Sequence, residues 1–106
     1  MQNQQTFGLK DSQLIKNFSY INGSWHSSET QITVTNPANG EEVAKVSNAG
    51  ITETELAVKA AKDALKMWSA KSANERAGLM RKWFNLMMEH QDDLGRILTL
   101  EQGKPL

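Results

Sequence analysis

The 106-residue sequence contains no cysteine and only two histidines. Without cysteine, this chain has no disulfide bond, no thiolate metal site and no cysteine nucleophile. His26 and His90 lie far apart in the sequence, and neither has another ligand-type residue at metal-binding spacing. We therefore expect His26 in a strand or turn and His90 as a solvated residue at the end of a helix.

The sequence also lacks an excess of either charge and any long apolar run. Its 12 basic residues balance its 12 acidic residues, so no charge pattern indicates binding to nucleic acid or to an anionic membrane. The apolar runs are too short to span a bilayer, and the polar start MQNQQTFGLKDSQ lacks the features of a secretory signal. These absences predict a cytoplasmic protein with neither nucleic acid nor membrane as a partner.

The first third of the chain predicts an arm followed by a β-hairpin. Residues 1–17 show no sustained hydrophobic period and are rich in polar residues, which predicts an arm that packs on another element or stays mobile. In FSYINGSWHS, short aromatic and β-branched segments flank Asn22-Gly23. That dipeptide is a strong signal for a tight hairpin turn.

A second reversal of the chain is expected around the sequence NPANG. The strand-like runs Ile32–Thr35 and Glu42–Val46 lie on either side of it. Pro37 presets a turn, and Asn39-Gly40 tolerates positive φ. Residues 18–50 are thus predicted to form a β-hairpin region.

Residues 51–106 predict three helices. In the first, Thr52 fits the N-cap of a capping box in which the side chain of Glu55 reaches back. Small residues then recur at helical spacing and form a narrow stripe that ends in a tryptophan. The stripe consists of Ala57, Ala61, Ala64 and Trp68.

The second helix begins with another capping box, Ser72 to Glu75, and its apolar arc spans about 200°. The main apolar face consists of Ala73, Ala77, Met80, Phe84, Met87 and Met88, and the arc is widened by Leu79, Trp83 and Leu86. So wide an arc needs partners on two sides, which so short a chain is not expected to supply. We interpret the methionine-rich face as core packing rather than as a binding groove. Arg76 lies at the edge of this face, so its guanidinium should pair with an acid or with helix-end carbonyls.

The third helix is predicted to begin near Asp92-Asp93 and to end at Gly103, with Pro105 preventing continuation. Its expected buried stripe, Leu94, Ile97 and Leu98, continues to Glu101. A buried carboxylate near a helix C-terminus needs compensation. Three alternatives remain open for Glu101. They are a salt bridge with Lys104 or Arg76, a partner in protein outside this chain, and a bound cation held with backbone carbonyls.

An ordered set of segments resembles the start of the aldehyde dehydrogenase superfamily. The segments are YINGSW, TNPANGEEVAKV, an alanine-rich helix ending in Trp, ERAGLMRKWFNLM and LEQGKPL. The run KWFNLMMEHQDDLGRILTLEQGKPL is similar to the NAD(P)-dependent succinate-semialdehyde dehydrogenases of bacteria, and the resemblance extends from about residue 9 onward. The fold class expected for this chain is therefore α+β, as the N-terminal part of an α/β Rossmann-like coenzyme domain covering residues 1–106.

The resemblance implies a homo-oligomeric enzyme several times longer than this chain. That enzyme oxidises succinate semialdehyde, or a related aldehyde, to the acid with NADP or NAD through a cysteine thioester. The catalytic cysteine, the general-base glutamate and the coenzyme-binding loop of the family lie beyond the equivalent of residue 106. No catalytic or cofactor-binding residue is therefore assigned here. In some members a structural cation is held at positions that correspond to Val34, Thr35 and Glu101.

Two functional hypotheses follow. In the first, the chain is an N-terminal fragment of a semialdehyde dehydrogenase and is inactive by itself. In the second, it is a non-catalytic interaction module or remnant that binds full-length subunits through its apolar helix faces.

Overall fold

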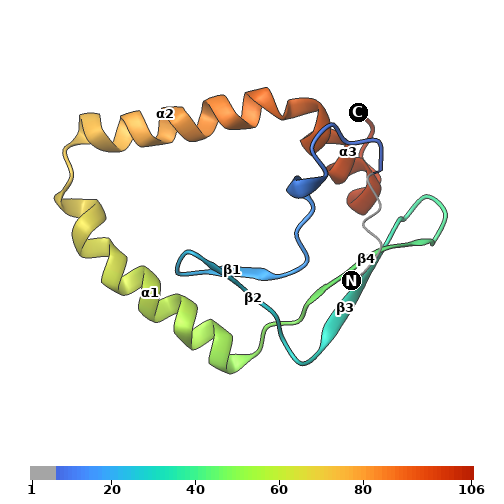
Figure 1. Ribbon diagram of the computed structural model, residues 1–106, viewed down its shortest axis with the longest axis horizontal. Coiled ribbons are helices and arrows are strands. Elements are labelled where there is room, and N and C mark those ends of the chain that lie inside the picture. Colours follow the sequence, from blue (N-terminus) through green and yellow to red (C-terminus); the bar gives the residue numbers. More distant parts are fainter. Residues whose placement is uncertain (1–6) are drawn as a thin grey trace.

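The computed structural model describes residues 7–106 as two small antiparallel β-hairpins followed by three helices. Helices α1 and α2 form an open arc around the first hairpin, and α3 and the second hairpin lie away from the junction of α1 and α2 (Figure 1). This arrangement confirms the predicted α+β class. The elements in chain order are η1 (Ser12–Leu14), β1 (Ser19–Ile21), β2 (Ser24–His26), β3 (Gln31–Thr35), β4 (Glu42–Ser47), α1 (Ile51–Ala70), α2 (Ala73–Glu89) and α3 (Gln91–Gln102).

The turn between β1 and β2 has the geometry that its sequence predicts. Asn22 has φ 50° and Gly23 has φ 80°, so both central residues are left-handed, as a two-residue hairpin loop requires. On one face of the hairpin, the rings of Tyr20 and Trp25 are 5.0 Å apart between centroids. The ammonium group of Lys16 lies 5.2 Å from the centroid of the Trp25 ring. The hairpin is thereby held by its turn and by one cross-strand aromatic pair.

The turn between β3 and β4 also confirms its prediction. The N–H of Gly40 donates to the carbonyl of Asn36 at 2.7 Å, and Gly40 takes the positive φ, 76°. The pairing of the two strands shifts register between Val34 and Thr35, where β4 carries one extra residue, Val43. Such a bulge bends the strand and locally disrupts the ladder of backbone hydrogen bonds.

Helix α1 begins earlier than predicted. Its N-cap is Gly50, not Thr52, and the N–H of Gly50 donates to Oε2 of Glu53 at 3.1 Å. The prediction of Thr52 with Glu55 was wrong because Glu53 supplies the same carboxylate three residues after an extended Gly50. The helix therefore starts two residues earlier, and Glu55 is left exposed.

The second capping box is confirmed at the start of α2. Oγ of Ser72 accepts from the N–H of Glu75 at 3.1 Å, and Oε1 of Glu75 accepts from the N–H of Ser72 at 3.0 Å. The hydrogen bond from the backbone N–H of Ser72 to the carboxylate, and secondly the interaction of the carboxylate with the Ser72 side chain, lower the pKa of Glu75. Arg76 donates from Nη1 to the carbonyl of Lys71, close to the end of α1, so its predicted pairing with a helix-end carbonyl is confirmed.

Helix α3 follows α2 after a single residue, His90, and ends as predicted. Gly103 has φ 79°, and its N–H donates to the carbonyl of Thr99 at 2.8 Å. This left-handed cap satisfies one of the free carbonyls in the last turn. A Cβ at Gly103 would lie 3.0 Å from Cγ of Pro37, so the end of α3 also approaches the β3–β4 turn closely.

The described arrangement buries little apolar surface. The chain exposes 8630 Å², whereas a compact monomer of this mass exposes about 5,900 Å². Its radius of gyration is 16.6 Å, against about 13 Å for a compact domain of similar length. Ile21, which is 7 % exposed, is the single buried apolar residue of the described part.

The predicted buried stripes are covered only in part. In α1, Ala57 is half-buried together with Ala60, where the first turns of the helix lie near β1. The rest of that stripe, Ala61, Ala64 and Trp68, is exposed. The methionine-rich face of α2 was interpreted as core packing. The described residues do not bury this face, because α2 is exposed from Ala77 to Glu89. The expectation that so short a chain does not supply partners for both sides of α2 is thereby confirmed.

In the described part of the chain, no helix has the length and apolarity that crossing a membrane requires.

Candidate functional site

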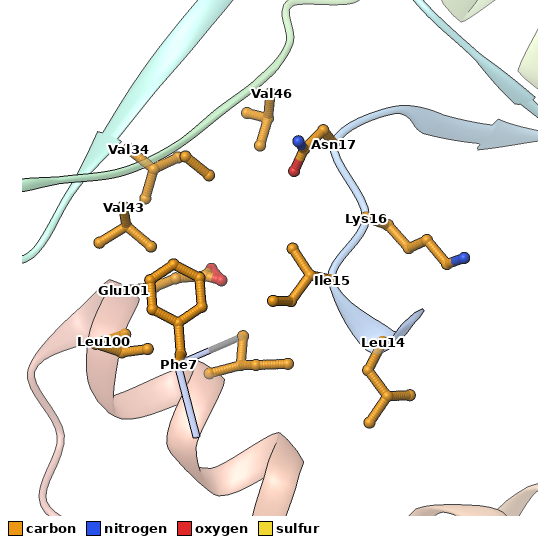
Figure 2. Close-up of a pocket in the computed structure, with 12 residues that line it drawn as sticks. Phe7, Leu14, Ile15, Lys16, Asn17, Val34, Val43, Val46, Leu100 and Glu101 are labelled. Carbon is orange, nitrogen blue, oxygen red and sulfur yellow. The ribbon is translucent and has the colours of Figure 1, made fainter. Parts of the chain in front are cut away.

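A cavity of about 170 Å³ lies between the N-terminal arm, the second hairpin and α3 (Figure 2). Its walls are largely aliphatic, with Val34 and Val43 from the hairpin, Ile15 from the arm and Leu100 from α3. Three parts of the chain that are distant in the sequence thus meet here. The predicted Glu101 also lies at this cavity.

The arm is held on α3 by the carboxylate of Asp93, which is 3 % exposed. Its Oδ1 accepts from the N–H of Lys10 at 2.9 Å, and its Oδ2 accepts from the N–H of Asp11 at 2.9 Å. These hydrogen bonds, aided by the nearby charges of His90 and Lys10, outweigh burial and hold the pKa of Asp93 below its usual range. We call this pair of hydrogen bonds the Asp93 clamp.

The sequence predicted Asp93 only as an acid near a helix N-terminus. The structure gives it a partner segment 82 and 83 residues away, and nothing in the local pattern indicates that partner. The exposed ion pair beside it, Lys10 to Asp92 at 3.9 Å, is of the kind that adds little stability.

The clamp positions two more arm residues at the cavity. Figure 2 shows the ring of Phe7 beside Glu101 and the side chain of Asn17 near Val46. The carbonyl of Asn17 accepts from the N–H of Ser47 at 2.8 Å, which ties the arm to β4 as well. Within residues 7–106, Oδ1 of Asn17 is buried and has no hydrogen-bond partner. The predicted arm therefore packs on other elements from residue 7 onward, and residues 1–6 of that prediction lie outside the described part.

Glu101 lies at the cavity but is exposed, so its expected burial on an apolar stripe was wrong. The stripe itself is only partly buried, because Ile97 is half-buried while Leu94 is 37 % and Leu98 is 46 % exposed. Among residues 7–106, no segment covers that side of α3 enough to bury Glu101.

The predicted salt bridges of Glu101 are not formed. Among residues 7–106, no ion pair within 4.0 Å involves Glu101. Arg76 instead donates to the carbonyl of Lys71, and the carbonyl of Lys104 accepts from Oγ1 of Thr99 at 2.6 Å. The first of the three alternatives for Glu101 was therefore wrong, and the other two stay predictions.

The cation prediction involves Val34, Thr35 and Glu101. The structure brings Val34 and Glu101 to the same cavity, while Thr35 follows Val34 in the strand and does not line the cavity. The bulge at Val43 of β4 lies opposite Val34 and Thr35, where the pairing of the two strands shifts register. Within the described residues, no group of three or more His, Asp or Glu side chains is placed to hold a metal.

Neither histidine belongs to the cavity. His26 lies in β2, as predicted, and its carbonyl accepts from Oγ of Ser47 at 3.3 Å. His90 caps the end of α2, but its side chain is 27 % exposed and its Nε2 lies 3.3 Å from Oε2 of Glu89. The prediction of a helix-end position for His90 is thus confirmed, whereas the prediction of a solvated side chain was wrong.

The described residues lack the parallel strand–helix unit that is typical of dinucleotide sites. Dinucleotide sites use a parallel strand–helix unit whose free helix N-terminus holds the pyrophosphate. Here both described sheets are antiparallel pairs. The N-terminal turns of the three helices carry the chain's own acids, Glu53, Glu75 and Asp93, each hydrogen-bonded to backbone N–H groups. The polar side chains in the lining of the cavity are those of Lys16, Asn17 and Glu101, among largely aliphatic neighbours.

Comparison with known proteins relates the chain to one family. Residues 25–106 match the model of the aldehyde dehydrogenase family. The NADP+-dependent succinate-semialdehyde dehydrogenase of Escherichia coli is 53 % identical over 100 residues, which are 92 % of this chain and 21 % of the relative. A glutarate-semialdehyde dehydrogenase and a 3-sulfolactaldehyde dehydrogenase of Pseudomonas putida are each 50 % identical, with the same coverage. The chain thus spans about a fifth of the length of these relatives.

Solved structures show the same arrangement of elements. An NADP-dependent enzyme of E. coli superposes with a TM-score of 0.89 at 52 % identity, over 92 % of this chain and 21 % of that one. The succinate-semialdehyde dehydrogenase of Burkholderia pseudomallei also gives a TM-score of 0.89, at 41 % identity and the same coverage. The arrangement of hairpins and helices in this chain is therefore that of a known fold, and the chain belongs to the aldehyde dehydrogenase family.

Proposed function

We propose that this chain is the N-terminal part of an enzyme that oxidises succinate semialdehyde, or a related semialdehyde, to the acid with NADP+ or NAD+. The observation that carries the proposal is the identity of 53 % across 92 % of the chain with a succinate-semialdehyde dehydrogenase. The TM-score of 0.89 to solved relatives supports it, since the chain holds the conformation that the same segment has there. On this proposal, residues 1–106 are part of the coenzyme domain, and the complete enzyme is a homo-oligomer.

The substrate class is a short aldehyde with an acidic group at its other end. The three bacterial relatives are named for succinate semialdehyde, glutarate semialdehyde and 3-sulfolactaldehyde, at 53 %, 50 % and 50 % identity. These molecules share an aldehyde and a terminal carboxylate or sulfonate. Identities so close do not select among the three substrates, and succinate semialdehyde is the first to test.

By itself, the 106-residue chain has no dehydrogenase activity. Covalent aldehyde oxidation needs a nucleophile, and the chain has no cysteine. The test is to incubate the purified chain with succinate semialdehyde and either coenzyme, and to follow the absorbance of the reduced nicotinamide. The E. coli relative serves as the positive control. Turnover above the enzyme-free background overturns the claim.

The proposal that the chain is part of a longer protein has a separate test. The genomic DNA that follows the codon for Leu106 is sequenced and translated. A reading frame that continues into a segment with a cysteine supports an aldehyde dehydrogenase. A stop codon at that point favours the alternative of a non-catalytic interaction module or remnant.

The cavity is also a candidate site for a structural cation held by Glu101 and the carbonyls of Val34 and Thr35. A carboxylate and backbone carbonyls are hard oxygen ligands, and a site with a single acidic side chain suits an ion of low charge. The test compares thermal unfolding in sodium, potassium and tetramethylammonium chloride at equal ionic strength. A higher Tm in one small cation, which is lost in Glu101→Gln but kept in Glu89→Gln, supports the site. Equal Tm values in all three salts count against it.

A further inference from the structure

The side-chain oxygen of Asn17 is an unused hydrogen-bond acceptor in the wall of the cavity. Within residues 7–106, this atom, Oδ1, is buried and has no hydrogen-bond partner. Asn17 lines the cavity, and Figure 2 shows its amide oxygen on the side of the cavity interior. A buried acceptor without a partner costs free energy. An occupant of the cavity that carries a hydrogen-bond donor would remove this cost.

The carboxylate of Glu101 adds a negative charge to the same cavity. Among residues 7–106, no ion pair within 4.0 Å involves Glu101. Lys16 also lines the cavity, but Figure 2 shows its side chain pointing away from the interior, and its ammonium group lies 5.2 Å from the centroid of the Trp25 ring. No cation of the described lining therefore neutralises Glu101. With one charged and one neutral acceptor, the cavity favours a donor that is itself a cation.

The rest of the lining is apolar and limits the kind of cation. Its aliphatic walls include Ile15, Val34, Val43 and Leu100. A buried water needs about two to four polar partners, and walls of this kind offer few of them. A bare metal ion binds oxygen ligands and gains nothing from aliphatic walls. A cation with a hydrocarbon body and an N–H donor at one end matches both parts of the lining.

The volume of the cavity sets the length of that hydrocarbon body. The cavity holds about 170 Å³, and an apolar cavity of roughly 150 Å³ admits a molecule of the size of benzene. A straight-chain primary amine of about four carbons has a similar number of heavy atoms. Its protonated head group carries N–H donors on all sides, as a lysine ammonium does, so one of them can reach Oδ1 of Asn17 while the charge stays near Glu101.

We propose that the cavity is a binding site for a short primary alkylammonium ion. The alkyl chain lies between the arm, the second hairpin and α3, the ammonium group donates to Oδ1 of Asn17, and its charge is balanced by Glu101. The inference rests on the part of the proposed function that places a cation at Glu101, and it names the chemical class of that cation. Asn17 is then a binding residue of the site in addition to Glu101.

The test observes the ligand by saturation-transfer difference NMR. The proteins are the 106-residue chain and a full-length chimera in which this chain replaces the matching segment of the E. coli succinate-semialdehyde dehydrogenase. Three probes are compared, namely n-butylammonium, tetramethylammonium, which has the charge but no N–H donor, and 1-butanol, which has the chain but no charge. We expect saturation of the butyl chain of n-butylammonium in both proteins, with a dissociation constant in the millimolar range, and little saturation of the other two probes.

Matched variants locate the bound n-butylammonium. Glu101→Gln removes the charge, and Asn17→Leu removes the acceptor with little change in volume. We expect each to weaken binding at least about tenfold, because each loses an interaction with a charged group. Glu89→Gln alters an exposed acid that does not line the cavity, and it should leave binding unchanged. Asn17→Asp keeps the shape and adds a negative charge, so it should tighten binding, and it decides the role of Asn17 if Asn17→Leu does not fold.

The outcomes separate this proposal from the proposed function. Absence of n-butylammonium binding to the chimera, or binding that neither Asn17 nor Glu101 variants change, overturns the alkylammonium site. Equal saturation of tetramethylammonium overturns it too, because a general attraction of cations then suffices. A Tm that rises in sodium or potassium without n-butylammonium binding overturns it and leaves a bare structural cation standing. Binding to a chimera that folds but does not oxidise succinate semialdehyde supports the site and counts against the proposed enzyme.

Discussion

The two ends of this molecule are built differently. At one end, the arm, the second hairpin and α3 hold one another through the Asp93 clamp, the hydrogen bond from Ser47 to Asn17 and the close approach of Gly103 to Pro37. The other end consists of the last turns of α1, the connection and α2, residues 61–89, which we call the elbow. The elbow is ordered by its own helical hydrogen bonds and by the capping box of Ser72, and almost all of its side chains are exposed. A helix can be well formed without a tertiary partner when the backbone N–H and C=O groups at its ends have local hydrogen-bond partners. Its apolar face, left unburied, then adds nothing to the stability of the chain.

This contrast predicts that stability depends on the clamped end and on the first hairpin, and not on the elbow. Ile21→Ala should have the largest effect, because it removes the single buried apolar side chain of the described residues. We expect a loss of about 2–3 kcal/mol in the free energy of unfolding. Urea denaturation measures it, with Ile51→Ala, whose side chain is 80 % exposed, as the control. Equal losses in the two variants would contradict the assignment of the core.

Asp93→Asn should release the arm. The amide that replaces the carboxylate has one acceptor oxygen, so one of the N–H groups of Lys10 and Asp11 loses its partner. Hydrogen exchange at these two amides should approach the rate of an unprotected peptide, and the Tm should fall by less than in Ile21→Ala. The matched control is Asp92→Asn, whose exposed ion pair should contribute little. Unchanged exchange at Lys10 and Asp11 would show that the arm is held by other contacts.

The clamp also predicts a dependence on pH. Hydrogen bonds to its carboxylate lower the pKa of Asp93 in the folded state. The stability from the clamp is therefore fully present above the unfolded pKa of about 3.9 and is lost as pH falls through the lower folded value. NMR titration of the amide protons of Lys10 and Asp11 should show this transition in the parent chain and not in Asp93→Asn. A transition above pH of about 5 would not fit a lowered pKa.

Gly103→Ala should weaken the contact between α3 and the second hairpin. The residue has φ 79°, and a Cβ there would lie 3.0 Å from Cγ of Pro37. The left-handed backbone alone costs an alanine about 1 kcal/mol, and the close contact adds to this. Thermal unfolding measures the loss. Gly78→Ala, inside α2 with no atom within 4 Å of its Cβ position, should instead be neutral or slightly stabilising.

The smallest effect is expected in the elbow. Leu86→Ala in the 106-residue chain should change the free energy of unfolding by less than about 0.5 kcal/mol, because the side chain is already 55 % exposed. In the full-length chimera, in which this chain replaces the matching segment of the E. coli succinate-semialdehyde dehydrogenase, the same substitution should cost several times more if the rest of the enzyme covers the elbow. Comparable changes in both proteins would remove the distinction between the two ends.

Most of the local structure could be predicted from the sequence. Residue type correctly indicated the positions of four local features. They are the left-handed turns at Asn22-Gly23 and Gly40, the capping box of Ser72 and the left-handed cap at Gly103. Each depends on backbone conformations and hydrogen bonds within about five residues, so the information is present in the local sequence. The one local error, Thr52 in place of Gly50, came from two glutamates that offered alternative starts for α1.

The candidate site could be predicted only in part. The sequence singled out Glu101 by its place in a helical pattern, and the structure puts it at the cavity with Val34. Its exposure could not be predicted, because it depends on whether other segments cover α3. Asp93 and Asn17 were not assigned to the site for the same reason, since their partners lie far away in the sequence.

The sequence by itself determined where this chain turns, where its helices start and stop, and to which family it belongs, because caps, turns and their order along the chain are set by neighbouring residues. Only the tertiary structure decided that Asp93 holds the arm, that Glu101 is exposed and that residues 7–106 leave the apolar arc of α2 uncovered. The physical reason is that burial is a property of all the segments that surround a side chain. A pattern of apolar residues specifies a face that needs covering, but it does not specify what covers it.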